Sequence, residues 1–255
     1  MPTSLRLASL VRTSALALLA LLCACSSAPP PHRPLADAKT FAIVSTTAGI
    51  DTLVSSRYDV LVLSDPTLVG TAIVDFLHKS QGASGRGKVV LGLADLAGDS
   101  SLIDHLVAAG FDGVVLRIAG EQIGDARART IAAVQEVAHR TQTPKRHFLV
   151  VPMDAGELVT EPTFARNVDG IVQRNLWFIA ASKDGDLRQA ASFRSALLPA
   201  LRGAAAAGIP VFTIDFAEGP VDAESVYKAA VDEHFIAYVT TGLQAGLSKT
   251  PPPGL

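Results

Sequence analysis

The sequence is poor in cysteine, in aromatic residues and in net charge. Of its 255 residues two are cysteines, Cys23 and Cys25, so a disulfide framework is excluded for the rest of the chain. The formal net charge is −2 and no segment carries a basic stripe, which gives no reason to expect a nucleic-acid ligand. Aromatic residues make up 5% of the chain, with one tryptophan, so few side chains can stack on a sugar ring.

Several motifs of cofactor and nucleophile chemistry are also missing. The six histidines show no metal-ligand spacing, and neither a dinucleotide fingerprint nor a G-x-S-x-G motif occurs. Residues 82–88 match most of a phosphate-binding loop, but Val89 replaces the hydroxyl residue that binds magnesium, and the loop enters a strand. The sequence therefore predicts no metal and no cofactor.

The N-terminus has the pattern of a targeting segment. Arg6 and Arg12 precede a short apolar stretch at residues 15–22, which is too short to span a bilayer. Leu22–Cys25 then resembles a bacterial lipobox, with Cys25 as the acylated residue. The alternative is an ordinary signal peptide that is cut nearby.

Lipid on Cys25 predicts a protein of the bacterial cell envelope, held at a membrane without a spanning helix. Because Ser26 rather than Asp follows the cysteine, we expect the outer membrane where the host has one. The chain then divides into a lipoprotein signal peptide (1–24), a Pro-rich tether (25–39), one folded domain (40–247) and a disordered tail (248–255). We expect a monomer.

Eight short apolar runs alternate with helical patterns in the folded part. They are residues 41–44, 58–63, 89–93, 113–116, 148–151, 168–173, 210–214 and 235–239. Because these runs are continuously apolar, we expect strands buried on both faces, which is typical of a parallel sheet. Eight β-α units predict a single-domain (β/α)₈ TIM-like barrel. An open doubly wound sheet is the alternative.

Polar residues follow most of these runs, and in a barrel the strand ends meet at one mouth. The clearest case is Arg117, which ends the run of GFDGVVLRIAG at residues 110–120. The full set is Asp65, Asp95, Arg117, Asp154, Arg174, Asn175 and Asp215, with Glu121 and Glu218 a few residues beyond. Paired carboxylates across a mouth are the groups that hydrolyse glycosides. For a single aspartate, such as Asp65 before Pro66, the alternative is a helix N-cap.

Five stretches resemble the polygalactosaminidase-type glycoside hydrolases, a barrel family that includes α-1,4-polygalactosamine hydrolases. They are YDVLVLSDP, GFDGVVLRIAG, FLVVPMDAGEL, NVDGIVQRNLWF and GIPVFTIDFAEG, in the family's order and spacing. The resemblance implies an endo-acting hydrolase of an amino-sugar polysaccharide, with Asp65 and Asp215 at catalytic positions. Asp95, Arg117, Glu121, Asp154, Arg174, Asn175 and Trp177 are the expected substrate-binding residues.

The chain departs from the family at positions that bear on catalysis. Arg117 replaces the carboxylate after GFDG, Arg174 replaces a glutamate, and Met153-Asp154 replaces a Gln-Asn pair. An arginine stays charged and can neither donate a proton nor act as a nucleophile. The alternative function is therefore an inactive barrel that binds an anionic glycan or a protein partner through Arg117 and Arg174. Trp177 is the one tryptophan that could serve as a sugar platform, or it packs between barrel and helix.

Overall fold

A computed structural model describes residues 34–45, 49–98, 100–120, 122–143, 146–179, 189–217, 219–241 and 247–253. From Pro34 onward the chain forms one compact unit. Cys25, the expected signal peptide and most of the expected tether lie outside the described residues, as do Glu121 and Glu218.

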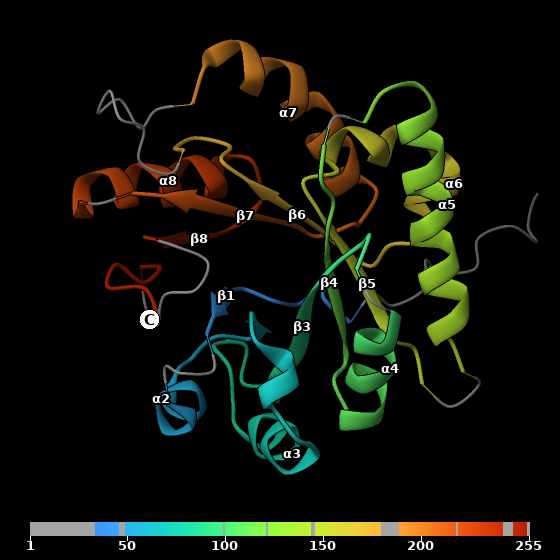
Figure 1. The fold of residues 1–255 in the computed structure, drawn as a ribbon. Helices are drawn as coiled ribbons and strands as arrows, with labels where there is room; N and C mark the ends of the chain where they lie inside the picture. The colour runs from blue at the N-terminus through green and yellow to red at the C-terminus, as the bar shows by residue number, and fades with distance from the viewer. Residues whose placement is uncertain are drawn as a thin grey trace, which may run out of the picture. The chain divides into compact units, whose positions relative to one another are not determined.

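Eight parallel strands alternate with helices along this unit (Figure 1). The strands are β1 (Phe41–Val44), β2 (Val60–Leu63), β3 (Val89–Asp95), β4 (Gly113–Arg117), β5 (Leu149–Met153), β6 (Ile171–Arg174), β7 (Val211–Phe216) and β8 (Ile236–Thr240). The helices are α2 (Ile50–Ser55), α3 (Thr71–Lys79), α4 (Ser100–Ala109), α5 (Gly124–Thr141), α6 (Pro162–Ala165), α7 (Ala191–Ala206) and α8 (Pro220–Asp232), with short 3₁₀ turns η2 (Pro66–Leu68) and η3 (Gly156–Thr160).

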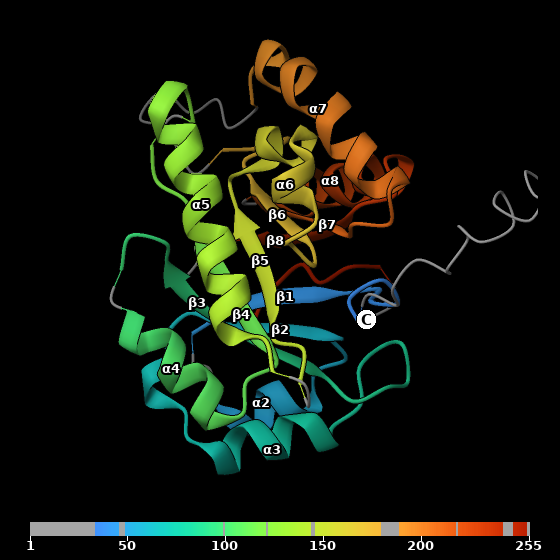
Figure 2. The ribbon, with the colours of Figure 1, turned by 90° about the vertical axis from the view of Figure 1, so that its right-hand side faces the viewer.

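The strands are paired in sequence order from β1 to β8. Figures 1 and 2 both show the helices outside the sheet, so each strand is covered on its outer face as well. Such sequential order differs from that of a doubly wound sheet, in which the strand order reverses at a switch point. The predicted single-domain (β/α)₈ barrel is confirmed.

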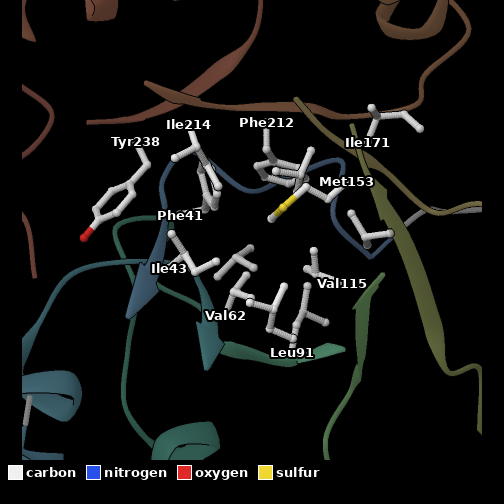
Figure 3. Close-up of a cluster of buried hydrophobic side chains, with 14 of the residues drawn as sticks. Phe41, Ile43, Val62, Leu91, Val115, Met153, Ile171, Phe212, Ile214 and Tyr238 are labelled. Carbon is white, nitrogen blue, oxygen red and sulfur yellow. The ribbon is translucent and has the colours of Figure 1, made fainter. Parts of the chain in front are cut away.

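The barrel interior is filled by one set of alternate side chains. Figure 3 shows Met153, Phe212 and Ile214 close to Phe41 and Val115 in this interior. The ring of Phe41 lies 5.0 Å from that of Phe212, so β1 and β7 are joined across the barrel centre. Because successive side chains on a strand point to opposite faces, the residues between these positions face the helices.

Three aspartates at the amino ends of alternate strands fix the strand pairs. Asp59 accepts the main-chain N–H of Thr40 at 3.2 Å, Asp112 that of Val90 at 2.8 Å, and Asp169 that of Val150 at 2.9 Å. Each aspartate thus lies at the start of the strand that follows its donor's strand in the chain, and the donors belong to, or directly precede, β1, β3 and β5. We call Asp59, Asp112 and Asp169 the amino-rim aspartates.

The seam between β1 and β8 is closed differently from the others. No ladder pairing joins these two strands in the described part of the chain. The main-chain N–H of Val239 instead donates to Tyr227 Oη at 3.3 Å, and this hydroxyl donates to the Thr250 carbonyl at 2.7 Å. Ser248 N–H donates to Tyr238 Oη at 3.1 Å. Residues 248–250 therefore belong to the packed structure.

The packed part is longer than the sequence suggested at both ends. Leu35 is wholly buried in the core, although it falls within the Pro-rich stretch, because its side chain packs close to Gly170 at the amino end of the barrel. At the other end, Thr250 is tied to Tyr227 rather than free. The folded domain thus extends beyond the expected limits of 40 and 247.

Candidate functional site at the carboxyl-end mouth

Three charged residues of the expected set face the barrel interior at its carboxyl end. Asp95 lies opposite Arg117 in the β3–β4 register, and Arg117 lies opposite Met153. Arg174 lies opposite Ile214. Residues opposite one another in a sheet share a face, and Figure 3 places Met153 and Ile214 inside the barrel. The structure therefore brings Asp95, Arg117 and Arg174 together at the mouth.

Asp95 and Arg117 form a two-point ion pair. Arg117 Nε donates to Asp95 Oδ1 at 2.7 Å, and Nη2 donates to Oδ2 at 2.8 Å. The Arg117 side chain is 40% exposed and that of Asp95 is 58% exposed. Exposed ion pairs contribute little to folding, with a median of about 0–1 kcal/mol, and two-point geometry places this pair toward the upper end of that range.

Asp154 and Arg174 form a second pair next to the first. Arg174 Nε donates to Asp154 Oδ2 at 2.6 Å, and the Arg174 main-chain N–H donates to Oδ1 at 3.0 Å. Asp154 and Asn175 both have positive φ angles, of 63° and 55°. Asp and Asn are the side chains that tolerate this conformation best, and it turns the chain sharply as it leaves β5 and β6.

Asp215 does not face the mouth. It follows the inward-facing Ile214, so its side chain points to the helix layer, and its exposure is zero. Asp215 Oδ1 accepts the main-chain N–H groups of Trp177 at 2.7 Å and Phe178 at 2.9 Å. The carboxylate therefore fixes the segment that follows β6.

Burial raises the pKa of Asp215 to about 6, although the N–H groups of Phe178 and Trp177 lower it in part. Asp215 Oδ2 has no hydrogen-bond partner among the described residues. A raised pKa is typical of a general acid, but this oxygen is buried away from the mouth.

Asp65 is held by hydroxyl groups and not by an arginine. Its Oδ2 accepts Ser45 Oγ at 2.8 Å and Ser64 Oγ at 3.2 Å. Asp65 stands at the N-cap position of η2, yet its side chain makes no capping bond. The catalytic roles expected for Asp65 and Asp215 stay predictions.

Trp177 packs against the protein. Its ring lies 6.4 Å from that of Phe235, which directly precedes β8, and it is half-buried against the core. The Trp177 carbonyl accepts the N–H of Gln189 at 2.8 Å. Of the two alternatives for this residue, packing between barrel and helix layer agrees with these contacts.

Two grooves flank the mouth. One, of about 350 Å³, is bounded by the ends of β5 and β6 and by α7, and includes Asp154, Arg174 and Asn175. The other, of about 590 Å³, is bounded by the ends of β3 and β4 and by α5, and includes Asp95, Arg117 and Arg129. Both are in the size range of small-molecule sites, roughly 300–1,000 Å³.

Sequence reasoning missed two residues of these grooves. Phe193 lines the smaller groove and is 40% exposed, and Arg129 lines the larger one and is exposed. Phe193, Leu197 and Leu201 lie four residues apart, so they share one face of α7. This spacing is typical of a buried stripe on a helix, so nothing in the sequence indicates that Phe193 is exposed.

A groove of about 700 Å³ lies at the other end of the barrel, between α7 and the starts of β7 and β8. Its lining is rich in alanine, and its Arg202 is paired with Glu233. We place the candidate site at the carboxyl-end mouth, because active sites of this fold lie there. Within the described ranges, no cluster of three or more metal-ligating side chains occurs, and no helix is long and apolar enough to cross a membrane.

Similarity to proteins of known sequence is limited. No family model matches the sequence. An uncharacterised protein of Deinococcus radiodurans is 30% identical over 142 residues, which are 54% of this chain and 45% of that protein. The chain therefore spans less than half the length of this relative.

Among solved structures, the glycoside hydrolase domain of PelA from Pseudomonas aeruginosa is similar, with a TM-score of 0.60 and 14% identity over 81% of this chain and 96% of that one. A malate synthase of Haloferax volcanii has a TM-score of 0.51 and 15% identity over 84% of this chain and 74% of that one. At such identities the likeness is one of fold. The chain thus has a barrel like that of a glycoside hydrolase domain.

Proposed function

We propose that this chain is a cell-envelope protein whose barrel binds a polysaccharide at the carboxyl-end mouth and does not hydrolyse it. The likeness to a glycoside hydrolase domain and the two grooves, each of which carries charged side chains beside apolar ones, support a glycan ligand. The observation that carries the proposal is that both inward-facing arginines, Arg117 and Arg174, are in ion pairs with the carboxylates of the mouth.

These ion pairs disfavour hydrolysis. Glycoside hydrolysis needs two carboxyl groups about 5–10 Å apart across the bond to be cut, one as an acid and one as a nucleophile or base. Asp95 and Asp154 are each engaged by an arginine side chain, so neither carboxylate is free to reach the bond to be cut. Asp215 has the raised pKa of an acid but faces the helices.

The same ion pairs suit the binding of sugar hydroxyls. A guanidinium group carries five N–H donors, and Arg117 uses two of them on Asp95. A carboxylate that accepts two such bonds keeps further lone pairs for other donors. Adjacent hydroxyl groups of a sugar donate and accept at once, so a half-exposed ion pair offers both kinds of partner to one ligand.

The location is a further part of the proposal. Acylation of Cys25 would anchor the barrel at a membrane, the outer one where two exist, through a tether that ends near Leu35. We propose a monomer without a nucleic-acid partner. The polysaccharide would then be one that lies within reach of this surface.

The screen described below also tests two other functions. The first is a hydrolase of an amino-sugar or other envelope polysaccharide that uses Asp65 and Asp215, with Glu121 or Asp154 as a substitute. The second is binding of an anionic glycan or partner through Arg117 and Arg174. Arg129 favours the second at the larger groove, because it adds a positive charge beside the neutralised Asp95–Arg117 pair.

The test is a screen of the full-length chain against neutral, cationic and anionic envelope polysaccharides, with binding and release of reducing ends followed together. We expect binding without new reducing ends. Arg117→Ala should weaken binding about tenfold, whereas Arg202→Ala, which removes a similar two-point pair at the opposite end of the barrel, should leave it unchanged. New reducing ends that Asp215→Asn abolishes would overturn the proposal in favour of the hydrolase.

A further inference from the structure

The smaller groove at the mouth has one apolar wall and one polar wall. Phe193, Ala196 and Leu197 come from one face of α7, at spacings of three and four residues. Asp154, Arg174 and Asn175 come from the ends of β5 and β6. The volume of about 350 Å³ is at the low end for small-molecule sites, which limits the occupant to a compact group.

The apolar wall presents the ring of Phe193. Leu201 and Leu197 of the same stripe are buried, with exposures of 0% and 8%, while Phe193 is 40% exposed. This stripe of apolar residues on α7 therefore continues beyond the buried core. Its last member, the ring of Phe193, is exposed beside the polar wall of the groove. The face of an aromatic ring carries partial negative charge and attracts C–H groups, such as those on one face of a pyranose.

The polar wall is held in place by the backbone. Asn175 N–H donates to the Ile214 carbonyl at 2.9 Å, and the Asn175 carbonyl accepts Gln189 Nε2 at 2.9 Å. The Asn175 side-chain oxygen has no hydrogen-bond partner in the described part of the chain. Rotation of this amide toward a ligand O–H would make a bond that the protein alone leaves unmade. Non-glycine residues at positive φ, here Asp154 and Asn175, often mark functional sites.

The net formal charge of each groove determines which ligands it favours. Asp154 and Glu157 contribute two negative charges to this groove and Arg174 contributes one positive charge, so its formal charge is −1. The larger groove has the opposite sign, because Asp95 is countered by both Arg117 and Arg129. An anionic sugar is therefore disfavoured at the smaller groove, whereas an uncharged one meets no charge penalty.

We propose that the smaller groove is a subsite for one uncharged pyranose unit, with the sugar ring stacked on Phe193 and its hydroxyls bonded to Asp154, Arg174 and Asn175. This inference rests on the proposed glycan-binding function and adds the position, the orientation and the charge class of the bound unit. Phe193, and not Trp177, is the aromatic platform.

The test uses saturation-transfer NMR on the full-length chain with methyl galactopyranoside, methyl glucopyranoside and glucuronate as probes. We expect at least one neutral pyranoside to bind, and Phe193→Ala to weaken its binding about fivefold or more. Phe76→Ala is the matched control, because Phe76 is also an exposed phenylalanine, lies on α3, and lines neither groove. Glucuronate should bind more weakly than the neutral probes, and Glu157→Gln should narrow that difference.

The proposal is overturned if Phe193→Ala binds the neutral probes as the wild type does, or if glucuronate binds as well as they do. Its failure is distinguishable from failure of the proposed function. Polysaccharide binding that needs Arg117 but not Phe193 would remove the subsite and keep the function. Neutral pyranosides that bind through Phe193 while every polysaccharide fails to bind would keep the subsite and remove the polysaccharide function.

Discussion

Both ends of this barrel carry a set of aspartates, and the two sets have different partners. At the amino rim, Asp59, Asp112 and Asp169 accept main-chain N–H groups of the neighbouring strands β1, β3 and β5. At the mouth, Asp95 is paired with the side chain of Arg117, and Asp154 accepts both the side chain and the main-chain N–H of Arg174. A bond to the backbone of a buried strand stabilises the fold, whereas a half-exposed side-chain pair such as Asp95–Arg117 contributes little to stability. We infer that the amino rim serves stability and the mouth serves binding.

The GFDG motif illustrates this division. Its aspartate, Asp112, accepts the N–H of Val90 and is bonded to His78 Nε2 at 2.7 Å. This hydrogen bond raises the pKa of His78 above its usual range. The most recognisable motif of the sequence is therefore a structural element at the amino rim, and the position that bears on function, Arg117, lies five residues later at the other end of β4.

The largest expected effect is at Asp59. This carboxylate accepts the N–H groups of Lys39 at 2.8 Å, Thr40 at 3.2 Å and Ser84 at 2.7 Å, so Asp59→Ala leaves one buried donor and two partly buried donors unpaired. We expect the free energy of unfolding to fall by about 3–5 kcal/mol, measured by urea denaturation at pH 7. Asp95→Ala, its counterpart at the mouth, should lose about 1 kcal/mol or less. Equal losses would remove the distinction between the two rims.

The pH dependence of Asp59 follows from its partners. Burial raises its pKa, but the N–H groups of Ser84 and Lys39 outweigh burial and hold the pKa below its usual range. Since the pKa is lower in the folded state, this stabilisation is present above the unfolded pKa and is lost as the pH falls through the folded one. The difference between wild type and Asp59→Ala should therefore shrink in acid.

Asp215 should show the opposite dependence. Its folded pKa of about 6 lies above the unfolded value, so its contribution is complete below the unfolded pKa and is lost as the pH rises through 6. Asp215→Asn keeps an oxygen for Trp177 and Phe178 and does not titrate. Between pH 4 and pH 7 the wild type should lose about 2 kcal/mol relative to this variant. Urea denaturation across this range measures the difference, and parallel curves for the two proteins would contradict the buried, ionising carboxylate.

The order of elements could be predicted from the sequence, because eight continuous apolar runs separated by helical patterns leave few arrangements. The direction in which the polar side chains at the strand ends point could not be predicted. A strand buried on both faces shows no alternation, so nothing in residues 211–216 tells whether Asp215 points to the mouth or to the helices. Its direction is set by the register that places Ile214 opposite Tyr238.

The aromatic platform shows the same limit. One tryptophan in a chain poor in aromatic residues attracts attention, but Trp177 packs on Phe235. Phe193 has the spacing of a core residue, yet it lies in the first turn of α7 and is 40% exposed. Pairing of a mouth aspartate with an arginine could be expected from the sequence, but the choice of Asp95 for Arg117 depends on the β3–β4 register, because the two residues are 22 apart in the chain.

The most direct measurement compares Asp95→Ala with Asp112→Ala, each assayed for both the free energy of unfolding and the affinity for the polysaccharide that the screen identifies. The account predicts that Asp95→Ala weakens binding about tenfold with little change in stability. It predicts that Asp112→Ala lowers the free energy of unfolding by about 2–3 kcal/mol and leaves the affinity of the folded fraction unchanged. If Asp95→Ala instead lowers stability and spares binding, the assignment of the mouth to glycan recognition is contradicted.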